Sequence, residues 1–273
     1  MDNQHISFAH ISDTHILKNY NTQSSKGWIE AGLYNPTQKL QETLRFIEQK
    51  YKNLDFILVS GDLVHDGKSA DYEFLKNIFR DITGSVPVFP AMGNHDNRRA
   101  FYEGFESRMG NDINDNPYYY VTEVRGLRII VLDSLVSCET TGEISEGQLS
   151  WLKDVLKTPS SMGSIIVLHH PPALNIRNAM FNYSLLNADK MADILSAKSV
   201  RAIFAGHVHL NSSLMLGNVP VFTTSGTAFG VDVDPENIYY LKQASFNYCE
   251  ITINETFVRQ HNIAEIVPLC RKI

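Results

Sequence analysis

Apolar and polar positions follow two patterns over the first two thirds of the chain. Short runs of branched aliphatic residues have the length and composition of buried β-strands. Longer stretches repeat apolar residues at helical spacing, as Leu40, Leu44 and Ile47 do. This pattern predicts strands at residues 6–11, 56–60, 86–91, 164–168 and 200–205, and helices at residues 37–52, 71–82, 98–105, 147–156 and 189–196.

The last third of the chain alternates apolar and polar residues with period two, which is typical of antiparallel strands. Earlier in the chain, residues 118–124 and 127–132 are expected to form a hairpin that turns at Arg125 and Gly126. Strand–helix units followed by a meander indicate an α/β fold with two mixed β-sheets packed face to face and helices outside. The runs with period two are residues 219–223, 248–253 and 256–261.

Composition limits the class of protein. The chain has 273 residues, of which 43% are hydrophobic and 20% charged, enough for one large core. Because we find no repeat or linker, residues 1–273 are expected to form a single domain, with the part from about 210 to 273 adding the antiparallel strands. The net charge of −6 makes a nucleic acid polymer an unfavourable partner.

The sequence predicts a cytoplasmic protein without a membrane span. No apolar run approaches the roughly 20 residues that a bilayer requires, and the N-terminus has no signal-peptide pattern. Three scattered cysteines, Cys138, Cys249 and Cys270, are typical of reduced thiols and not of a disulfide framework.

Five polar clusters each come directly after a predicted strand. Because strand ends in an open α/β sheet share one edge, we expect the clusters to converge although almost 200 residues separate the first from the last. The clusters are Ser12-Asp13-Thr14-His15, Gly61-Asp62-Leu63-Val64-His65-Asp66-Gly67, Gly93-Asn94-His95-Asp96, His169-His170-Pro171-Pro172 and Gly206-His207-Val208-His209.

The chemistry of these clusters indicates a metal centre. Carboxylate, amide and imidazole donors without thiolates suit Mn, Fe, Co, Ni or Zn better than Ca. Seven donors exceed the needs of one tetrahedral ion and match two ions that share a carboxylate. The glycines that precede Asp62, Asn94 and His207 are expected to let the backbone turn sharply. The candidate ligands are Asp13, His15, Asp62, Asn94, His169, His207 and His209.

Each cluster alone has a simpler interpretation. Asp13 and His15 could cap a helix or bond a loop, Asp62 could be a turn aspartate, and His169 could end a strand. The His207-x-His209 pair is the most specific of the five. Together, in this order and each after an apolar strand, the clusters favour the metal centre over these structural roles.

The constellation resembles the calcineurin-like metallophosphoesterase superfamily, whose five motif blocks are all present between residues 9 and 209. The resemblance implies a four-layer αββα sandwich with two divalent or mixed-valence ions, of Mn, Fe or Zn. It assigns one ion to Asp13, His15, His209 and a bridging Asp62, and the other to Asp62, Asn94, His169 and His207. His169 precedes His170 as ligand because the family pattern is His-x-Pro.

Two branches of the superfamily do not match. Purple acid phosphatases carry a metal-bound tyrosine where this chain has His65, and Ser/Thr protein phosphatases carry an arginine where it has Asp66. The motif set looks most like class III cyclic nucleotide phosphodiesterases and bacterial glycerophosphodiesterases, which act on small phosphodiesters. A DNA-repair-type nuclease, a phosphomonoesterase and a catalytically idle metal-binding scaffold remain as alternatives.

The resemblance makes His95 the catalytic histidine, as a phosphate ligand or proton donor. The hypothesis is an in-line attack on phosphorus by a metal-bridging hydroxide, with His95 protonating the leaving group. His65, Asp96 and His170 are candidates for supporting roles, His65 or Asp96 by orienting the His95 ring.

Substrate choice is expected to come from loops. The segment 173–186 is too apolar for an idle loop, and it could wall the pocket, cover the core or contact a second subunit. A homodimer is among the expectations that the resemblance implies, because related enzymes often form dimers.

Overall fold

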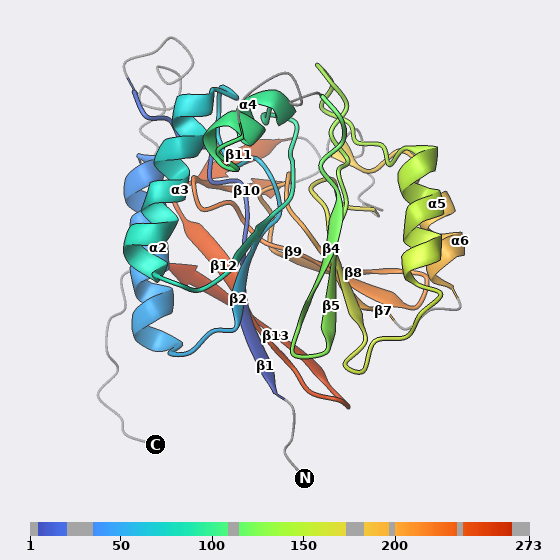
Figure 1. Ribbon diagram of the computed structural model, residues 1–273. Coiled ribbons are helices and arrows are strands. Elements are labelled where there is room, and N and C mark those ends of the chain that lie inside the picture. The colour runs from blue at the N-terminus through green and yellow to red at the C-terminus, as the bar shows by residue number, and fades with distance from the viewer. Residues whose placement is uncertain are drawn as a thin grey trace.

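The computed structural model describes residues 5–20, 35–108, 115–172, 183–196, 200–233 and 237–263. Its first sheet has five strands in the order β13-β12-β1-β2-β3 (Figure 1). The strands β1, β2 and β3 are parallel, while β12 is antiparallel to both β1 and β13. Their bounds are β1 Ile6–Ile11, β2 Phe56–Val59, β3 Val88–Pro90, β12 Ala244–Ile251 and β13 Thr256–Ile263.

The second sheet has six strands in the order β4-β5-β6-β7-β9-β8. The four strands β5, β6, β7 and β9 are parallel neighbours, and antiparallel β4 and β8 form the two edges. Their bounds are β4 Tyr120–Val124, β5 Leu127–Val131, β6 Ser164–Val167, β7 Val200–Ala205, β8 Ser212–Leu216 and β9 Val219–Thr223.

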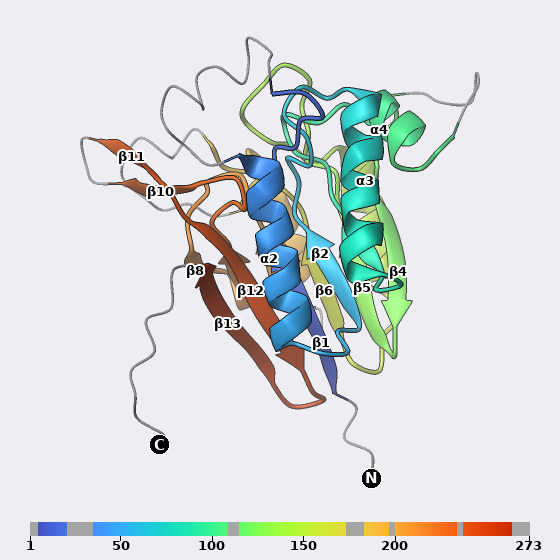
Figure 2. The same cartoon turned by 90° about the vertical axis from the view of Figure 1, so that its left-hand side faces the viewer.

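Helices cover the outer face of each sheet, which gives four layers (Figures 1 and 2). Helices α2, α3 and α4 lie on the first sheet, and α5 and α6 lie on the second. Side chains of Asn35, Asn97 and Ser145 accept hydrogen bonds from the first turns of α2, α4 and α5, so local sequence fixes where these helices begin. The bounds are α2 Pro36–Lys50, α3 Ser69–Thr83, α4 Arg98–Gly104, α5 Glu146–Val155 and α6 Ala188–Leu195.

The core between the two sheets is aromatic at its centre. Phe8 of β1 stacks on Phe56 of β2 with ring centroids 4.6 Å apart and meets Phe204 of β7 edge to face at 5.4 Å. All three rings are fully buried. Because Phe204 belongs to the second sheet, this contact holds the two sheets in one arrangement.

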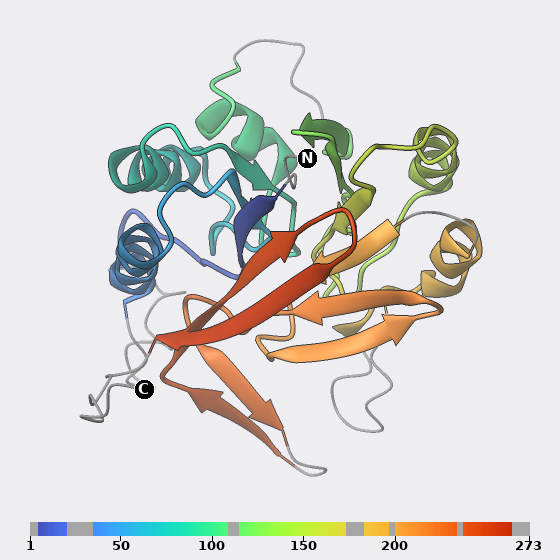
Figure 3. The same cartoon turned by 90° about the horizontal axis from the view of Figure 1, so that it is seen from below.

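The predicted α/β fold of two mixed sheets with flanking helices is confirmed. The structure differs in the last third, where the predicted antiparallel pattern is incomplete: β9 lies parallel to β7 and antiparallel to β8. The alternation also gave no separate signal for β8 or for the hairpin of β10 (Gly230–Val233) and β11 (Ile238–Leu241). In Figure 3 this hairpin stands apart from both sheets.

Two other expectations concern thiols and membranes. Cys138 and Cys249 are free thiols, the first exposed and the second buried, and Cys270 lies outside the described residues. Within the described ranges, none of the helices has both the length and the apolar character needed to cross a bilayer. Most of the 173–186 segment also lies outside the described residues, which resume at Tyr183.

We expect Phe204→Ala to lower the free energy of unfolding by about 3–5 kcal/mol, because it leaves a cavity where the sheets meet. The matched control Phe257→Ala removes a ring that is 48% exposed and should cost less than about 1 kcal/mol. Urea unfolding followed by circular dichroism measures both. Equal losses of unfolding free energy in the two variants would contradict the assignment of Phe204 to the core between the two sheets.

Candidate active site

The polar clusters meet where strands of both sheets end. Asp13 follows β1, Asp62 follows β2, His169 follows β6 and His207 follows β7. Main-chain hydrogen bonds join these loops: the Asp13 amide donates to the Gly61 carbonyl at 3.0 Å. The loops are therefore fixed relative to one another before any ligand binds.

The backbone at this edge has an unusual conformation. Five of the seven candidate ligands have positive φ angles, a region that few residues other than glycine adopt. Such conformations cost about 1–3 kcal/mol each and persist where the surrounding structure enforces them, often at functional sites. The five are Asp13, His15, Asp62, His207 and His209.

One group of donor atoms lies on the β1 side of the site. The Nε2 atom of His209 lies 3.3 Å from Asp13 Oδ1 and 3.3 Å from His15 Nε2. His15 Nε2 lies 3.6 Å from Asp62 Oδ2. These four side chains are buried, and ligand atoms of Asp13, His15 and His209 lie within 4.8 Å of one another. Asp13 also groups with Asp62 and His169.

A second group gathers around His169. Its Nε2 atom lies 3.1 Å from His207 Nδ1, 3.2 Å from Asn94 Oδ1 and 3.4 Å from Asp62 Oδ1. The two oxygens of the Asp62 carboxylate thus face different groups. This is the geometry expected of a carboxylate shared by two ions.

The carboxylates and imidazoles of the two donor groups shift one another's pKa values. Burial opposes ionisation of Asp62, but the imidazoles of His169 and His15 outweigh it and hold the pKa of the carboxyl well below its usual range. Burial would likewise lower the pKa of His169, but the facing Asp62 carboxylate raises it to about 9. The carboxylates therefore stay ionised and demand positive charge nearby.

Main-chain carbonyls fix the tautomers of two histidines. His169 Nδ1 donates to the Ser60 carbonyl at 2.7 Å, and His209 Nδ1 donates to the Phe229 carbonyl at 2.9 Å. In the neutral rings the lone pair must then be on Nε2, the atom that faces the other donors. This is the arrangement in which protein histidines bind metals.

The donor set fits two cations. In each group, electron-rich nitrogen and oxygen atoms approach one another, which is favourable only with a proton or cation between them. The buried Nε2 atoms of His207 and His170 have no hydrogen-bond partner among the described residues. Mixed nitrogen and oxygen donors match divalent transition ions.

The three glycines that precede candidate ligands are needed for two different reasons, only one of which was expected. Gly61 does adopt a positive φ of 91°. Gly93 and Gly206 do not, and a Cβ atom there would lie 2.2 Å from Asp62 Oδ1 and 1.8 Å from Ser12 Oγ. Sharp turning therefore explains Gly61, while close approach to ligand loops explains Gly93 and Gly206.

His95 lies at the rim of the second group. Its main-chain amide donates to Asp62 Oδ1 at 2.9 Å, and its ring Nδ1 contacts the His65 carbonyl oxygen at 3.1 Å. The His65 ring lies 3.4 Å from His15, nitrogen to nitrogen. With Nδ1 donating to His65, the Nε2 atom of His95 is the one available to a substrate.

Asp96 and His170 support the loops instead of facing His95. The Asp96 carboxylate accepts hydrogen bonds from the Tyr72 hydroxyl and from main-chain amides, including Gly93 at 2.8 Å. Burial and the nearby Asp62 raise its pKa to about 7. His170 contacts Ser134 Oγ at 2.8 Å through Nδ1, and its ring lies against His207 with centroids 4.5 Å apart.

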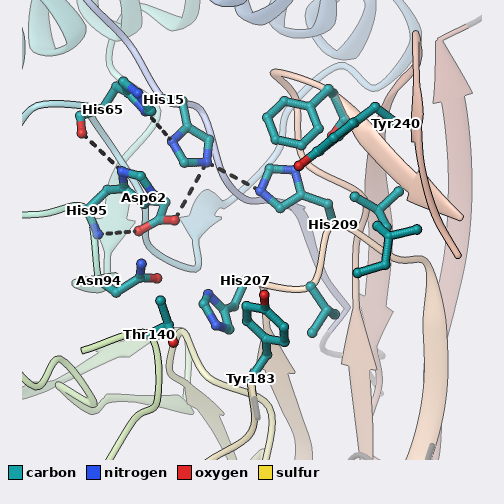
Figure 4. Close-up of a pocket in the computed structure, with 14 residues that line it drawn as sticks. His15, Asp62, His65, Asn94, His95, Thr140, Tyr183, His207, His209 and Tyr240 are labelled. Atoms are coloured by element: carbon teal, nitrogen blue, oxygen red, sulfur yellow. Dashed lines mark hydrogen bonds and ion pairs between the residues drawn. The ribbon is translucent and has the colours of Figure 1, made fainter. Parts of the chain in front are cut away.

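A cavity of 290 Å³ opens over the donor groups (Figure 4). One wall carries predicted site residues, among them His15, Asp62, Asn94 and His95. On the other wall, Tyr183 belongs to the segment 173–186, which the sequence analysis expected could wall the pocket. The remaining residues of this wall were not predicted from the sequence, because none of them is a candidate ligand. This wall consists of Thr140, Tyr183, Phe229, Val231, Ile238 and Tyr240, with Val208.

We expect Asp62→Asn to lower bound metal by at least half, because the amide brings no negative charge to either donor group. Metal content after dialysis against Mn²⁺ can be measured by plasma mass spectrometry. Asp154→Asn is the control, since that carboxylate is exposed on α5. If Asp62→Asn kept its full metal content, Asp62 would not be a carboxylate shared by two ions.

Comparison with known proteins relates this site to named enzymes. The chain is 34% identical over 233 residues to a Rhodococcus erythropolis protein named "Probable cyclic nucleotide phosphodiesterase", covering 84% of this chain and 73% of that one. A cAMP/cGMP dual specificity phosphodiesterase of Mycobacterium tuberculosis is 32% identical, and the match covers 82% of this chain and 68% of that protein. A "Probable glycerophosphodiester phosphodiesterase" of Arcobacter nitrofigilis is 27% identical, with 82% and 79% covered.

Solved structures share the fold at lower identity. A dimetal phosphatase from Danio rerio has a TM-score of 0.60 at 17% identity, with 93% of this chain and 98% of that chain covered. The purple acid phosphatase of yellow lupin has a TM-score of 0.65 at 12% identity, with 96% and 54% covered. The family model for calcineurin-like phosphoesterases matches residues 6–211. The family predicted from the sequence is thus confirmed: this chain belongs to the calcineurin-like phosphoesterases.

Proposed function

We propose that the protein hydrolyses small phosphodiesters of the cyclic nucleotide or glycerophosphodiester type with two bound metal ions. The observation that carries the proposal is the Asp62 carboxylate, whose two oxygens face separate donor groups 3.6 Å from His15 Nε2 and 3.4 Å from His169 Nε2. The names of the relatives support the substrate class, and all seven donors are present here.

Different residues of the chain would bind the two ions, orient the His95 ring and donate the proton. Asp13, His15 and His209 would hold one ion, Asn94, His169 and His207 the other, with Asp62 shared. When bound, the ions supply a water activated near neutral pH and neutralise phosphoryl oxygens. His95 carries a proton at Nε2 toward the leaving oxygen while the His65 carbonyl orients its ring through Nδ1.

The charge of the pocket favours a diester over a monoester. Two divalent ions with two carboxylates and a hydroxide leave a small positive charge, which suits the single negative charge of a diester. Among the described residues that line the cavity there is neither lysine nor arginine to balance a second charge. The donor set suits Mn, Fe, Co, Ni or Zn, and the resemblance to the family narrows the proposal to Mn, Fe or Zn.

Two further parts of the proposal concern the cell and assembly. The exposed free thiol of Cys138 supports a reducing location, the cytoplasm. The exposed apolar side chains Leu186 and Met215 are compatible with a homodimer, which sedimentation at several protein concentrations would detect.

A substrate panel tests the activity. With Mn²⁺ added, bis-p-nitrophenyl phosphate should be turned over much faster than p-nitrophenyl phosphate, and single-stranded DNA should be cleaved little. Rapid DNA cleavage would support a nuclease instead. An absence of turnover with Mn²⁺, Fe²⁺ and Zn²⁺ would support the idle scaffold and overturn the proposal.

We expect His95→Ala to lower kcat for bis-p-nitrophenyl phosphate by about 10²–10⁴-fold, because a positioned proton donor is lost. Its metal content should equal that of the parent protein, since all seven candidate ligands remain in this variant. His5→Ala, which removes a half-exposed histidine at the edge of β1, is the control and should retain full activity. Unchanged kcat in His95→Ala would contradict the role of His95.

A further inference from the structure

The β10–β11 hairpin presents an apolar face whose residues share one side of the ribbon. In its register Val231 pairs with Tyr240 and Val233 pairs with Ile238. Because side chains alternate along a strand, these four residues project from the same face, and Tyr239 projects from the other. Ile238 and Tyr240 are 41% and 64% exposed, and Tyr239 on the other face is 49% exposed.

This face belongs to the wall of the active-site cavity. Val231, Ile238 and Tyr240 line the same 290 Å³ cavity as His209 and His15. Figure 4 shows Tyr240 beside His209, one of the candidate ligands. The exposed apolar face of the hairpin therefore lies directly beside the candidate metal ligands.

Aromatic rings make that surface continuous with the donor groups. Phe229 stacks on His209 with centroids 4.1 Å apart and planes 20° apart, and it meets Tyr240 edge to face at 5.4 Å. Tyr183 lies at another part of the cavity, 5.5 Å from the His207 ring. A substrate held by its phosphoryl group would therefore extend its organic part along rings and aliphatic side chains.

We infer that this face binds the base of a nucleoside phosphodiester, which rests on the proposed function. A nucleobase is a planar ring system with apolar faces and lies one sugar away from the phosphoryl group, so it can reach the hairpin while the phosphorus stays at the donor groups. Stacking on an aromatic side chain is a sequence-tolerant source of affinity for any base. A glycerol diester has no ring and gains little from this wall. The hairpin therefore selects cyclic nucleotides over glycerophosphodiesters.

The test compares two substrates in Tyr240→Ala. For 3′,5′-cyclic AMP, KM should rise about tenfold, because one stacking contact is lost. For glycerophosphocholine, kcat and KM should stay within about twofold. Tyr240→Trp should restore the KM for cyclic AMP, which a merely structural role would not predict. Tyr239→Ala is the matched control, as it removes a neighbouring tyrosine from the opposite face of the same strand.

Equal changes for both substrates in Tyr240→Ala, or no change for either, would overturn the inference. A shift of Tyr240→Ala from dimer to monomer in light scattering, with equal losses for both substrates, would identify the face as a contact between copies instead. If the parent protein hydrolyses neither diester, the proposed function itself fails. If it hydrolyses both and Tyr240→Ala does not separate them, only the inference about the hairpin fails.

Discussion

Buried negative charge is the constraint on which this site depends. Asp13 and Asp62 are almost fully buried, and burying an ionised carboxylate costs several kcal/mol unless positive charge offsets it. Imidazoles alone meet this demand only by taking up protons, as the raised pKa of His169 indicates. Cations at the two donor groups meet it without protons. The fold, the fixed tautomers and the strained loop backbones all serve to hold these donors at the two points where a cation would sit.

Much of the fold could be predicted, because local pattern and global architecture agree in the first two thirds of the chain. An aliphatic run such as that of β6 is buried on both faces, and the amphipathic helices α5 and α6 cover its sheet. The last third was harder, since period-two alternation does not show which strand pairs with which. The pairing of β9 with β7 depends on a long-range parallel contact that has no local signal.

The convergence of the candidate ligands could also be predicted, since each follows a strand and the topology brings the strand ends together. The sequence did not indicate that Asp96 bonds main-chain amides, or that Gly93 and Gly206 are needed for space, because both facts depend on how loops pack. The apolar wall with Phe229 and Tyr240 was missed for the same reason. Its residues become a surface only when the β10–β11 hairpin folds next to the metal centre.

The central claim is that Asp62 lies between two cations. Anomalous diffraction from crystals equilibrated with Mn²⁺ tests it most directly, because it locates each ion independently of activity. The account predicts two peaks about 3.5–4 Å apart, one beside Asp62 Oδ2 with His15 and His209, and the other beside Oδ1 with His169. A single peak, or donors dispersed away from any peak, would contradict it.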